Sequence, residues 1–371
     1  MAWAATLRWG LLALAIAPAL VQGALAGGSV MFSDQERFGV GVARQYGDVT
    51  DYDVAGLRVG WYMDWSYSAA PARPGGIAYM QLVRTLPDGS PPDWASLEAA
   101  VRANPGAWWL VGNEPDARPG VMDSQPPASY AAAYHSIYTF IKALDGSAHV
   151  GPGGVIQPTP LRLRYLDMAL DAYEAQHGAP LPADFWATHV QILQEDRDDW
   201  GAGIPQGIGD DTGRLYTIQD NGDPAIFEQL VRELRAWMAA RGLRDKPLVI
   251  SEYGVLMPSL YLCYCDDYAI GDAIVVDFMR RSFDFLLSAS DAATGCPGDG
   301  NRLVQRWSWY SLNDKPYDVP PYGIGYNGAL YDFSVREYPG KLTLFGRAFS
   351  GYLARLLSPY HLYLPMSVQQ K

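Results

Sequence analysis

The chain has 371 residues, of which 49% are hydrophobic and 18% are charged, and this composition excludes a disordered protein. Its formal net charge is −12 and it carries no basic patch, which argues against nucleic-acid binding because phosphate backbones would be repelled. No Gly/Ser-rich or Pro-rich linker and no repeat of fixed period divides the sequence, so we expect one large domain.

The first 26 residues have the pattern of a secretory signal peptide. Arg8 provides a positive charge, residues 10–21 form an apolar segment, and Ala24-Leu25-Ala26 offers the small residues of a cleavage site. A membrane anchor is the alternative, but the apolar segment is shorter than the ~20 residues that a spanning helix needs. We therefore expect cleavage after Ala26, a secreted or extracytoplasmic protein of residues 27–371, and no stable membrane insertion.

Apolar runs typical of buried strands alternate along the chain with segments of helical periodicity. Continuous apolar runs indicate parallel strands that are buried on both faces. The expected strands lie at residues 38–43, 57–62, 78–83, 107–111, 149–155, 185–191, 247–250 and 303–310. The expected helices lie at residues 94–103, 130–141, 165–175, 226–238, 272–287 and 344–357. No convincing helix separates the second and third strands, because that segment is rich in Pro and Gly.

This order of strands and helices predicts an α/β fold with parallel strands. Eight strands is the number that closes a (β/α)8 barrel, also called a TIM barrel. A doubly wound open sheet is the alternative, and it would usually carry a Gly-rich nucleotide-binding turn after its first strand. Gly39 and Gly41 lie inside the first apolar run, so that turn is missing. We predict a single-domain (β/α)8 barrel.

Two of the apolar runs end in a glutamate, Glu114 in Ala107–Asp116 and Glu252 in Pro247–Gly254. The active site of a (β/α)8 barrel lies at the C-terminal ends of its strands, so both carboxyl groups are expected in one cleft. Two converging carboxyl groups suit glycosidic bond cleavage, in which one protonates the leaving oxygen and the other attacks the anomeric carbon. The alternative is that each glutamate merely caps the helix after its strand. The presence of both favours the catalytic interpretation.

The segment from residue 194 to residue 224 shows no strand or helix pattern and is rich in Asp and Gly. Its spacing does not match a calcium-binding loop, so ordinary turns are expected. Loops of this length are often functional. We expect this one to wall the substrate cleft.

Three cysteines occur in an export context, Cys263, Cys265 and Cys296. An odd number leaves one thiol unpaired or pairs it between chains. Cys263 and Cys265 are too close in sequence to form a disulfide with each other comfortably, so we expect one of them to pair with Cys296. A zinc site would need more ligands at closer spacing.

The strand-end motifs resemble those of a known group of enzymes. Gly112-Asn113-Glu114-Pro115-Asp116 and Ile250-Ser251-Glu252-Tyr253-Gly254 resemble the acid/base and nucleophile motifs of clan A glycoside hydrolases. The Asn-Glu-Pro-Asp form, together with Ala187-Thr188-His189 on the sixth strand, is similar to the family of small secreted barrels that includes β-1,3-glucanases. The resemblance covers roughly residues 37–357.

The resemblance implies that Glu114 is the general acid/base and that Glu252 is the nucleophile. It also implies that Asn113 contacts the sugar 2-hydroxyl group, that Trp309 forms the floor beneath the cleaved sugar, and that His189 is the sixth-strand histidine. The family usually has a tyrosine that hydrogen-bonds the nucleophile where this chain has Gln191, and Tyr253 is a candidate to replace it.

The aromatic content is 13%, and these side chains either fill a large core or stack on sugar rings. Trp61, Tyr62 and Trp65 are candidate stacking platforms, with burial the alternative for Trp61.

We therefore predict a secreted retaining hydrolase of a β-linked oligo- or polysaccharide, with β-glucan favoured. This mechanism needs neither metal nor organic cofactor, and we expect a monomer. One alternative is a catalytically inactive barrel that binds extracellular polysaccharide, and another is a two-carboxylate metallohydrolase, which the lack of a His-rich ligand set disfavours.

Overall fold

The structure is a computed structural model that describes residue 1 and residues 31–265, 267–317 and 325–358. The predicted signal peptide lies outside the described residues, apart from Met1.

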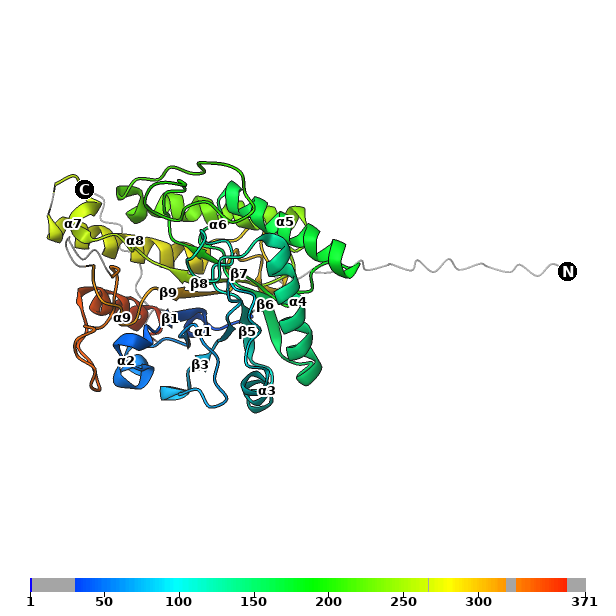
Figure 1. The fold of residues 1–371 in the computed structure, drawn as a ribbon. Coiled ribbons are helices and arrows are strands. Elements are labelled where there is room, and N and C mark those ends of the chain that lie inside the picture. The colour runs from blue at the N-terminus through cyan, green and yellow to red at the C-terminus, as the bar shows by residue number, and fades with distance from the viewer. Residues whose placement is uncertain (2–30, 266, 318–324, 359–371) are drawn as a thin grey trace.

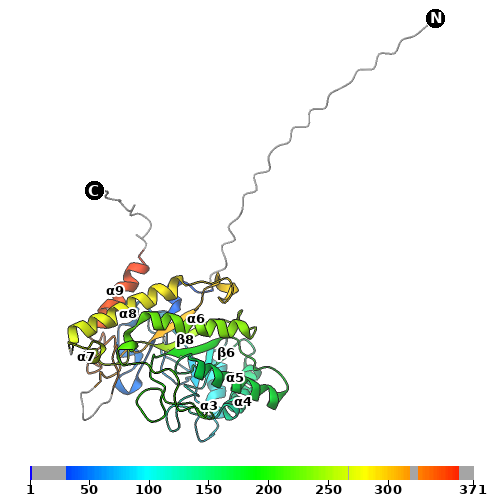
Figure 2. The ribbon, with the colours of Figure 1, turned by 90° about the horizontal axis from the view of Figure 1, so that it is seen from above.

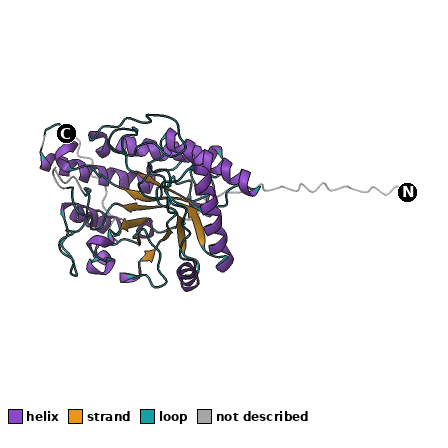
Figure 3. Ribbon diagram, viewed as in Figure 1, coloured by secondary structure: helices purple, strands orange, loops and turns teal. Residues whose placement is uncertain are grey.

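Parallel strands form the centre of the molecule, and helices surround them (Figures 1 and 3). One sheet has the strand order β3-β2-β1-β9-β8-β7 and the other has the order β4-β5-β6, and every pairing within them is parallel. The strands are β1 (Phe38–Gly41), β2 (Trp61–Met63), β3 (Ala78–Tyr79), β4 (Gln81–Val83), β5 (Trp108–Val111), β6 (His149–Pro152), β7 (Trp186–Val190), β8 (Leu248–Tyr253) and β9 (Arg306–Trp309). The prediction of an α/β fold with parallel strands is confirmed.

Hydrogen bonds connect the two sheets at both of their junctions. At one junction β3 and β4 belong to a single extended segment interrupted only at Met80, whose N–H donates to the carbonyl of Tyr62 at 3.0 Å. At the other junction Val155, which follows β6, forms an isolated parallel bridge with Thr188 of β7. The backbone N–H of His189 donates to the carbonyl of Val155 there at 2.7 Å.

Helices cover the outer faces of the strands, and α6 and α8 lie side by side over β8 (Figure 2). The α-helices are α1 (Asp34–Arg37), α2 (Val54–Leu57), α3 (Trp94–Ala103), α4 (Pro127–Leu144), α5 (Pro160–His177), α6 (Pro224–Ala240), α7 (Ser259–Leu262), α8 (Tyr268–Ser288) and α9 (Leu344–Leu356). Helix α6 begins at Pro224, two residues before the predicted start, because Asp223 caps the N–H of Ala225 and Pro224 occupies the first turn. Within the described residues, no helix combines the length and apolarity needed to cross a membrane.

The region between the first and third predicted strands differs from expectation in one respect. Residues 54–57 form the short helix α2, and the second strand begins only at Trp61. Asp53 caps this helix, and Arg58 ends it in a left-handed conformation with φ 63°. As expected, the described residues contain no α-helix between β2 and β3, where Pro74–Gly76 forms a 3₁₀ turn.

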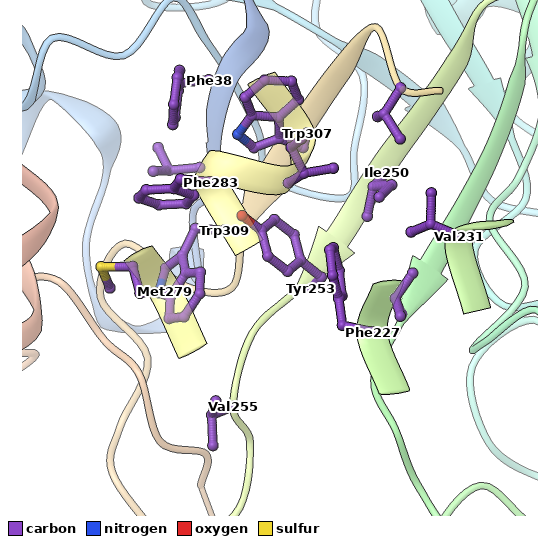
Figure 4. Packing of buried hydrophobic residues seen from close by; sticks show 14 of the residues in the cluster. Phe38, Phe227, Val231, Ile250, Tyr253, Val255, Met279, Phe283, Trp307 and Trp309 are labelled. Atoms are coloured by element: carbon purple, nitrogen blue, oxygen red, sulfur yellow. The ribbon is translucent and has the colours of Figure 1, made fainter. Parts of the chain in front are cut away.

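Both faces of the strands are buried, which explains their continuous apolar sequences. On β8, Leu248 and Ile250 face the helices, whereas Val249 faces the opposite side. The helix side holds a large aromatic cluster that includes Trp307, Trp309, Tyr253, Phe227 and Phe283 (Figure 4). The other side holds a smaller cluster comprising Trp61, Met63, Met80, Leu82, Leu110, Phe185, Ala187 and Val249.

The predicted cysteine pairing is wrong. Cys263 and Cys265 form a disulfide with each other, while Cys296 is a buried free thiol. The turn at Cys263–Cys265 brings the two Cα atoms to 5.2 Å, inside the range that disulfides accept. The Sγ atom of Cys296 lies 3.5 Å from the carbonyl oxygen of Asp245.

Candidate active site

A cavity of about 880 Å³ lies at the C-terminal ends of the strands and is lined by Glu114 and Glu252. The loops that wall it come from widely separated parts of the chain. The predicted wall segment contributes Trp200, Gly201, Ala202 and Ile218, which confirms that this loop borders the cavity. The other lining residues include Trp65, Arg84, Asn113, Arg118, Met122, Gln191, Leu193, Leu256, Met257, Tyr261, Tyr310, Tyr317 and Tyr326.

Glu114 is presented by a tight backbone turn after β5. Gly112 adopts φ 92° there and its N–H donates to the carbonyl of Val83 at 2.7 Å. Asp123, a buried carboxylate, accepts hydrogen bonds from the N–H groups of Asn113 and Thr85 at 2.7 and 2.8 Å. These contacts fix the turn, and Glu114 itself adopts φ 51°.

Non-glycine residues in left-handed backbone conformations gather at this cavity. Besides Glu114, they include Trp65 at φ 56°, Met122 at φ 50° and Ile192 at φ 53°. Such conformations cost on the order of 1–3 kcal/mol each and persist where function requires them. Glu114, Trp65 and Met122 line the cavity and Ile192 adjoins it, whereas Arg58 and Asn301 adopt this conformation outside the cavity lining.

His189 of β7 links the two glutamates. Its Nδ1 atom lies 2.9 Å from Oε1 of Glu114 and 3.9 Å from Oε2 of Glu252, and the ring is buried. Burial lowers the pKa of His189, but the carboxyl groups of Glu252 and Glu114 outweigh that effect and the pKa is raised. Gly154 makes room for the ring, since a Cβ atom there would lie 2.6 Å from the imidazole Cδ2 atom.

Both carboxyl oxygens of Glu252 accept hydrogen bonds from neutral donors. Nε2 of Gln191 donates to Oε1 at 2.7 Å, and Nε1 of Trp65 donates to Oε2 at 3.0 Å. Burial and the negative charge of Glu114 raise the pKa of Glu252 to about 7, although His189 and the Trp65 hydrogen bond act in the opposite direction. Gln191 thus occupies the place of the expected tyrosine and makes the contact to Glu252.

Asn221 holds Gln191 in place. Its Nδ2 atom donates to the carbonyl oxygens of Gln191 and Ile192 at 2.5 and 3.2 Å. Its Oδ1 atom accepts from the N–H groups of Leu256 and Met257 at 2.8 and 3.1 Å. One buried amide therefore joins the segment after β7 to the segment after β8.

Arg162 of α5 anchors the Glu114 loop to the long wall loop. The guanidinium group is fully buried and forms ion pairs with Asp116 and Glu195. It also donates to the carbonyl oxygens of Ala202 and Gly203 at 3.0 and 2.9 Å. The wall of the cavity is therefore tied rigidly to the segment that follows Glu114.

Glu114, His189 and Glu252 are also the set of described residues whose ligand atoms could share a metal ion, since these atoms all lie within 4.8 Å of one another. His189 is instead hydrogen-bonded to Glu114, and an ion bound there would replace that hydrogen bond.

Two of the predicted site residues, Trp309 and Tyr253, lie in the core outside the cavity. Trp309 is buried against Tyr253, Phe278 and Phe283, and its Nε1 atom donates to the carbonyl of Gly328 at 2.8 Å (Figure 4). Tyr253 is fully buried in the same cluster. The predictions that Trp309 forms the floor and that Tyr253 replaces the missing tyrosine are therefore wrong. Trp309 lies on the same helix-facing side of β9 as Trp307, and a register shift of β8 between Ile250 and Tyr253 places Tyr253 on the helix side as well.

The candidate platforms divide between core and cavity. Trp61 is fully buried, with the guanidinium group of Arg306 4.7 Å from its ring, so burial, the alternative left open for it, holds and stacking on sugar does not. Tyr62 is buried as well. Trp65 lines the cavity, as predicted. Gly41 permits its position, since a Cβ atom there would meet the indole ring at 2.9 Å.

The sequence interpretation missed Tyr310, Tyr326, Trp200, Arg84 and Arg118, which all line the cavity. Tyr310 could have been found from strand alternation, because it follows the helix-facing Trp309. The same reasoning applies to Arg84, which follows the helix-facing Val83 of β4. Tyr326, Trp200 and Arg118 lie on loops, where sequence spacing contains no comparable signal.

No protein-family model matches this chain, and no curated protein matches it. Solved structures similar to it include two described as GH128 (subgroup VII) oligosaccharide-binding proteins. The one from Cryptococcus neoformans has 14% identity and a TM-score of 0.48, with 87% of this chain and 95% of that chain covered. The one from Trichoderma gamsii has 13% identity and a TM-score of 0.47, with coverages of 88% and 98%.

A β-glucosidase from Exiguobacterium marinum is similar to the same degree, with 13% identity and a TM-score of 0.47, and the match covers 87% of this chain and 99% of that one. The case for function rests on the geometry of the cavity.

Proposed function

We propose that the protein is a secreted glycoside hydrolase that cleaves β-linked glycans with retention of anomeric configuration, β-glucan being the glycan that the sequence motifs favour. One observation carries this proposal: carboxyl oxygens of Glu114 and Glu252 lie within 4.8 Å of each other at the base of an aromatic-lined cavity. Retaining enzymes place their two carboxyl groups about 5–5.5 Å apart, whereas inverting enzymes separate them by about 6.5–9.5 Å to admit a water molecule.

We propose further that the two sheets together form one closed (β/α)8 barrel. The hydrogen bonds at both junctions between the sheets support this arrangement, as does the sequential order of the strands around them. Glu114 follows the fourth strand of such a barrel and Glu252 lies at the C-terminal end of the seventh, where its active site is expected.

In the first step the carboxylate of Glu252 attacks the anomeric carbon and forms a glycosyl-enzyme ester, while Glu114 protonates the departing glycosidic oxygen. In the second step Glu114 removes a proton from water, which attacks the anomeric carbon and releases Glu252. The hydrogen bonds from Gln191 and Trp65 orient the Glu252 carboxylate for attack. The mechanism uses no metal, and chelation is expected to leave the rate unchanged.

His189 can supply the proton that the first step consumes. Its Nδ1 atom lies 2.9 Å from Oε1 of Glu114, and the neighbouring carboxyl groups raise the pKa of His189, which favours a proton at this position. The proposed mechanism requires an ionised Glu252 and a proton on the His189–Glu114 pair.

The first testable prediction concerns pH. Because Glu252 must be ionised and its pKa is about 7, kcat/KM is expected to fall as the pH drops below about 7. Substituting His189→Gln removes a positive charge that lowers the pKa of Glu252, so the acidic limb of the pH profile should move to higher pH. An unmoved limb, or one moved to lower pH, contradicts this assignment.

The second prediction concerns Gln191. The Gln191→Met substitution keeps the shape but removes the donor to Glu252, and a hydrogen bond to a charged group is worth about 1.5–3 kcal/mol. We expect kcat/KM to fall about 10- to 100-fold, with the fold intact by circular dichroism. Gln194→Ala, which removes an amide paired with Asp199 at the surface, is the matched control and should keep full activity. Equal activities of the two variants would refute a positioning role.

A panel of polysaccharides tests the function itself. The purified protein is incubated with β-linked and α-linked glycans, with and without EDTA, and the products are identified by mass. Release of oligosaccharides from β-linked glycans alone is the expected result. Binding without products would favour the alternative of an inactive polysaccharide-binding protein, and loss of activity with EDTA would favour a metal-dependent hydrolase.

A further inference from the structure

The cavity lining contains as many positive as negative side chains, although the protein as a whole is strongly acidic. Among the described lining residues, the charged ones are Glu114, Glu252, Arg84 and Arg118. The chain as a whole has a formal net charge of −12. Two arginines therefore line the same cavity as the two glutamates, although the molecule as a whole is negatively charged, and the proposed hydrolysis does not use these arginines.

Arg118 is held at the cavity but has no partner among the described residues. No hydrogen bond or ion pair joins its side chain to any of them, and the residue is exposed. Its aliphatic stem lies over Gly203, where a Cβ atom would meet the Arg118 Cδ atom at 2.9 Å. The backbone before it is fixed, since Ala117 is buried and its carbonyl accepts from Ser124 Oγ at 2.8 Å.

The guanidinium group of Arg84 is held through its Nε atom only. Its Nε atom forms an ion pair with Asp123, the carboxylate that also holds the N–H of Asn113. Its two terminal nitrogens form no hydrogen bond to another described residue, and the side chain is 35% exposed. Arg84 therefore keeps its planar pair of donors available next to Asn113.

We propose that Arg118 and Arg84 bind an anionic substituent of the substrate, either the carboxylate of a uronic acid or a sulfate ester. A guanidinium group binds such planar or tetrahedral oxyanions through paired hydrogen bonds and recognises them better than it recognises hydroxyl groups. This inference rests on the proposed function and changes its substrate from a neutral β-glucan to a β-linked glycan that carries negative charge.

A matched pair of ligands tests the proposal. Oligosaccharides of β-1,4-linked glucuronate and the cello-oligosaccharides obtained by carboxyl reduction differ only at C6, and 6-sulfated cello-oligosaccharides test the second source of charge. Affinity is measured by calorimetry on the Glu252→Gln protein, which prevents turnover. We expect the glucuronate or the sulfated oligosaccharide to bind about tenfold or more tightly than the neutral one, with a preference that weakens as salt increases.

Variants assign that preference to its residues. Arg118→Ala should abolish most of the preference by lowering the affinity for the charged oligosaccharide much more than the affinity for the neutral one, and Arg118→Lys should retain part of it. Arg164→Ala removes an exposed arginine that pairs with Asp210 outside the cavity, and it should keep the full preference. Equal affinity for charged and neutral oligosaccharides, an equal loss of both in Arg118→Ala, or binding of neither overturns the proposal.

The same measurements separate this inference from the proposed function. Hydrolysis of neutral oligosaccharides by the wild-type protein without any preference for charge overturns the inference and leaves the hydrolase standing. Charge-selective binding without hydrolysis supports the inference about Arg118 and Arg84 and overturns the proposed hydrolase function.

Discussion

The Glu252→Ala substitution is expected to lower kcat/KM about 10⁴-fold or more, because the mechanism then lacks the atom that attacks the anomeric carbon. Gln191 and Trp65 donate hydrogen bonds to the carboxyl group of Glu252, which lies 3.9 Å from His189. The alanine variant has no carboxyl group at this position. Initial rates on an aryl β-glycoside that the wild type cleaves provide the measurement.

Azide gives this prediction a chemical control. The alanine leaves space for a small anion, and azide that attacks the anomeric carbon directly should restore turnover and yield an α-glycosyl azide. Glu174→Ala, which removes an exposed glutamate on α5, should retain wild-type activity. A Glu252→Ala protein that stays active without azide would exclude Glu252 as the nucleophile.

The Glu114→Gln substitution is expected to impair cleavage in proportion to the basicity of the leaving group. General acid catalysis contributes about 10²–10⁴-fold, so oligosaccharides and alkyl glycosides should lose that much in kcat/KM. A dinitrophenyl glycoside needs no protonation and should still form the glycosyl-enzyme rapidly. The measurement is the burst of released phenol followed by slow turnover, since the second step also lacks its base.

The dependence on the leaving group distinguishes catalysis from structure. Glu114 hydrogen-bonds His189, and a merely structural loss would slow every substrate by the same factor. A uniform loss across leaving groups would therefore contradict the acid/base role.

The strand and helix order could be predicted from the sequence because both faces of these strands are buried. Continuous apolar runs such as Trp108–Val111 then mark strands without ambiguity. The short helix α2 was missed, because a single helical turn ended by Arg58 in a left-handed conformation has no periodicity to detect. The prediction of the cysteine pairing was wrong for a related reason. The local turn brings the Cα atoms of Cys263 and Cys265 to 5.2 Å, and sequence separation alone does not reveal such a turn.

The convergence of Glu114 and Glu252 was also predictable, because both lie at or just beyond the C-terminal ends of parallel strands, and these ends meet. The sequence analysis assigned the wrong residues of β8 and β9 to the cavity, although alternation along β9 would have identified Tyr310. Trp309 and Tyr253 lie in the helix-side core, and Tyr310 reaches the cavity instead. The role of Gln191 could not be predicted either. Its amide makes the contact to Glu252 that was expected of a tyrosine, and the residue type alone does not indicate this contact.

The anomeric configuration of the first product tests the central claim most directly. Proton NMR spectra recorded within the first minutes of hydrolysis of a β-linked substrate, before mutarotation, identify the anomer released. Two displacements through Glu252 predict the β-anomer as the initial product. Initial release of the α-anomer would show a single displacement by water and would contradict the assignment of Glu252 as the nucleophile.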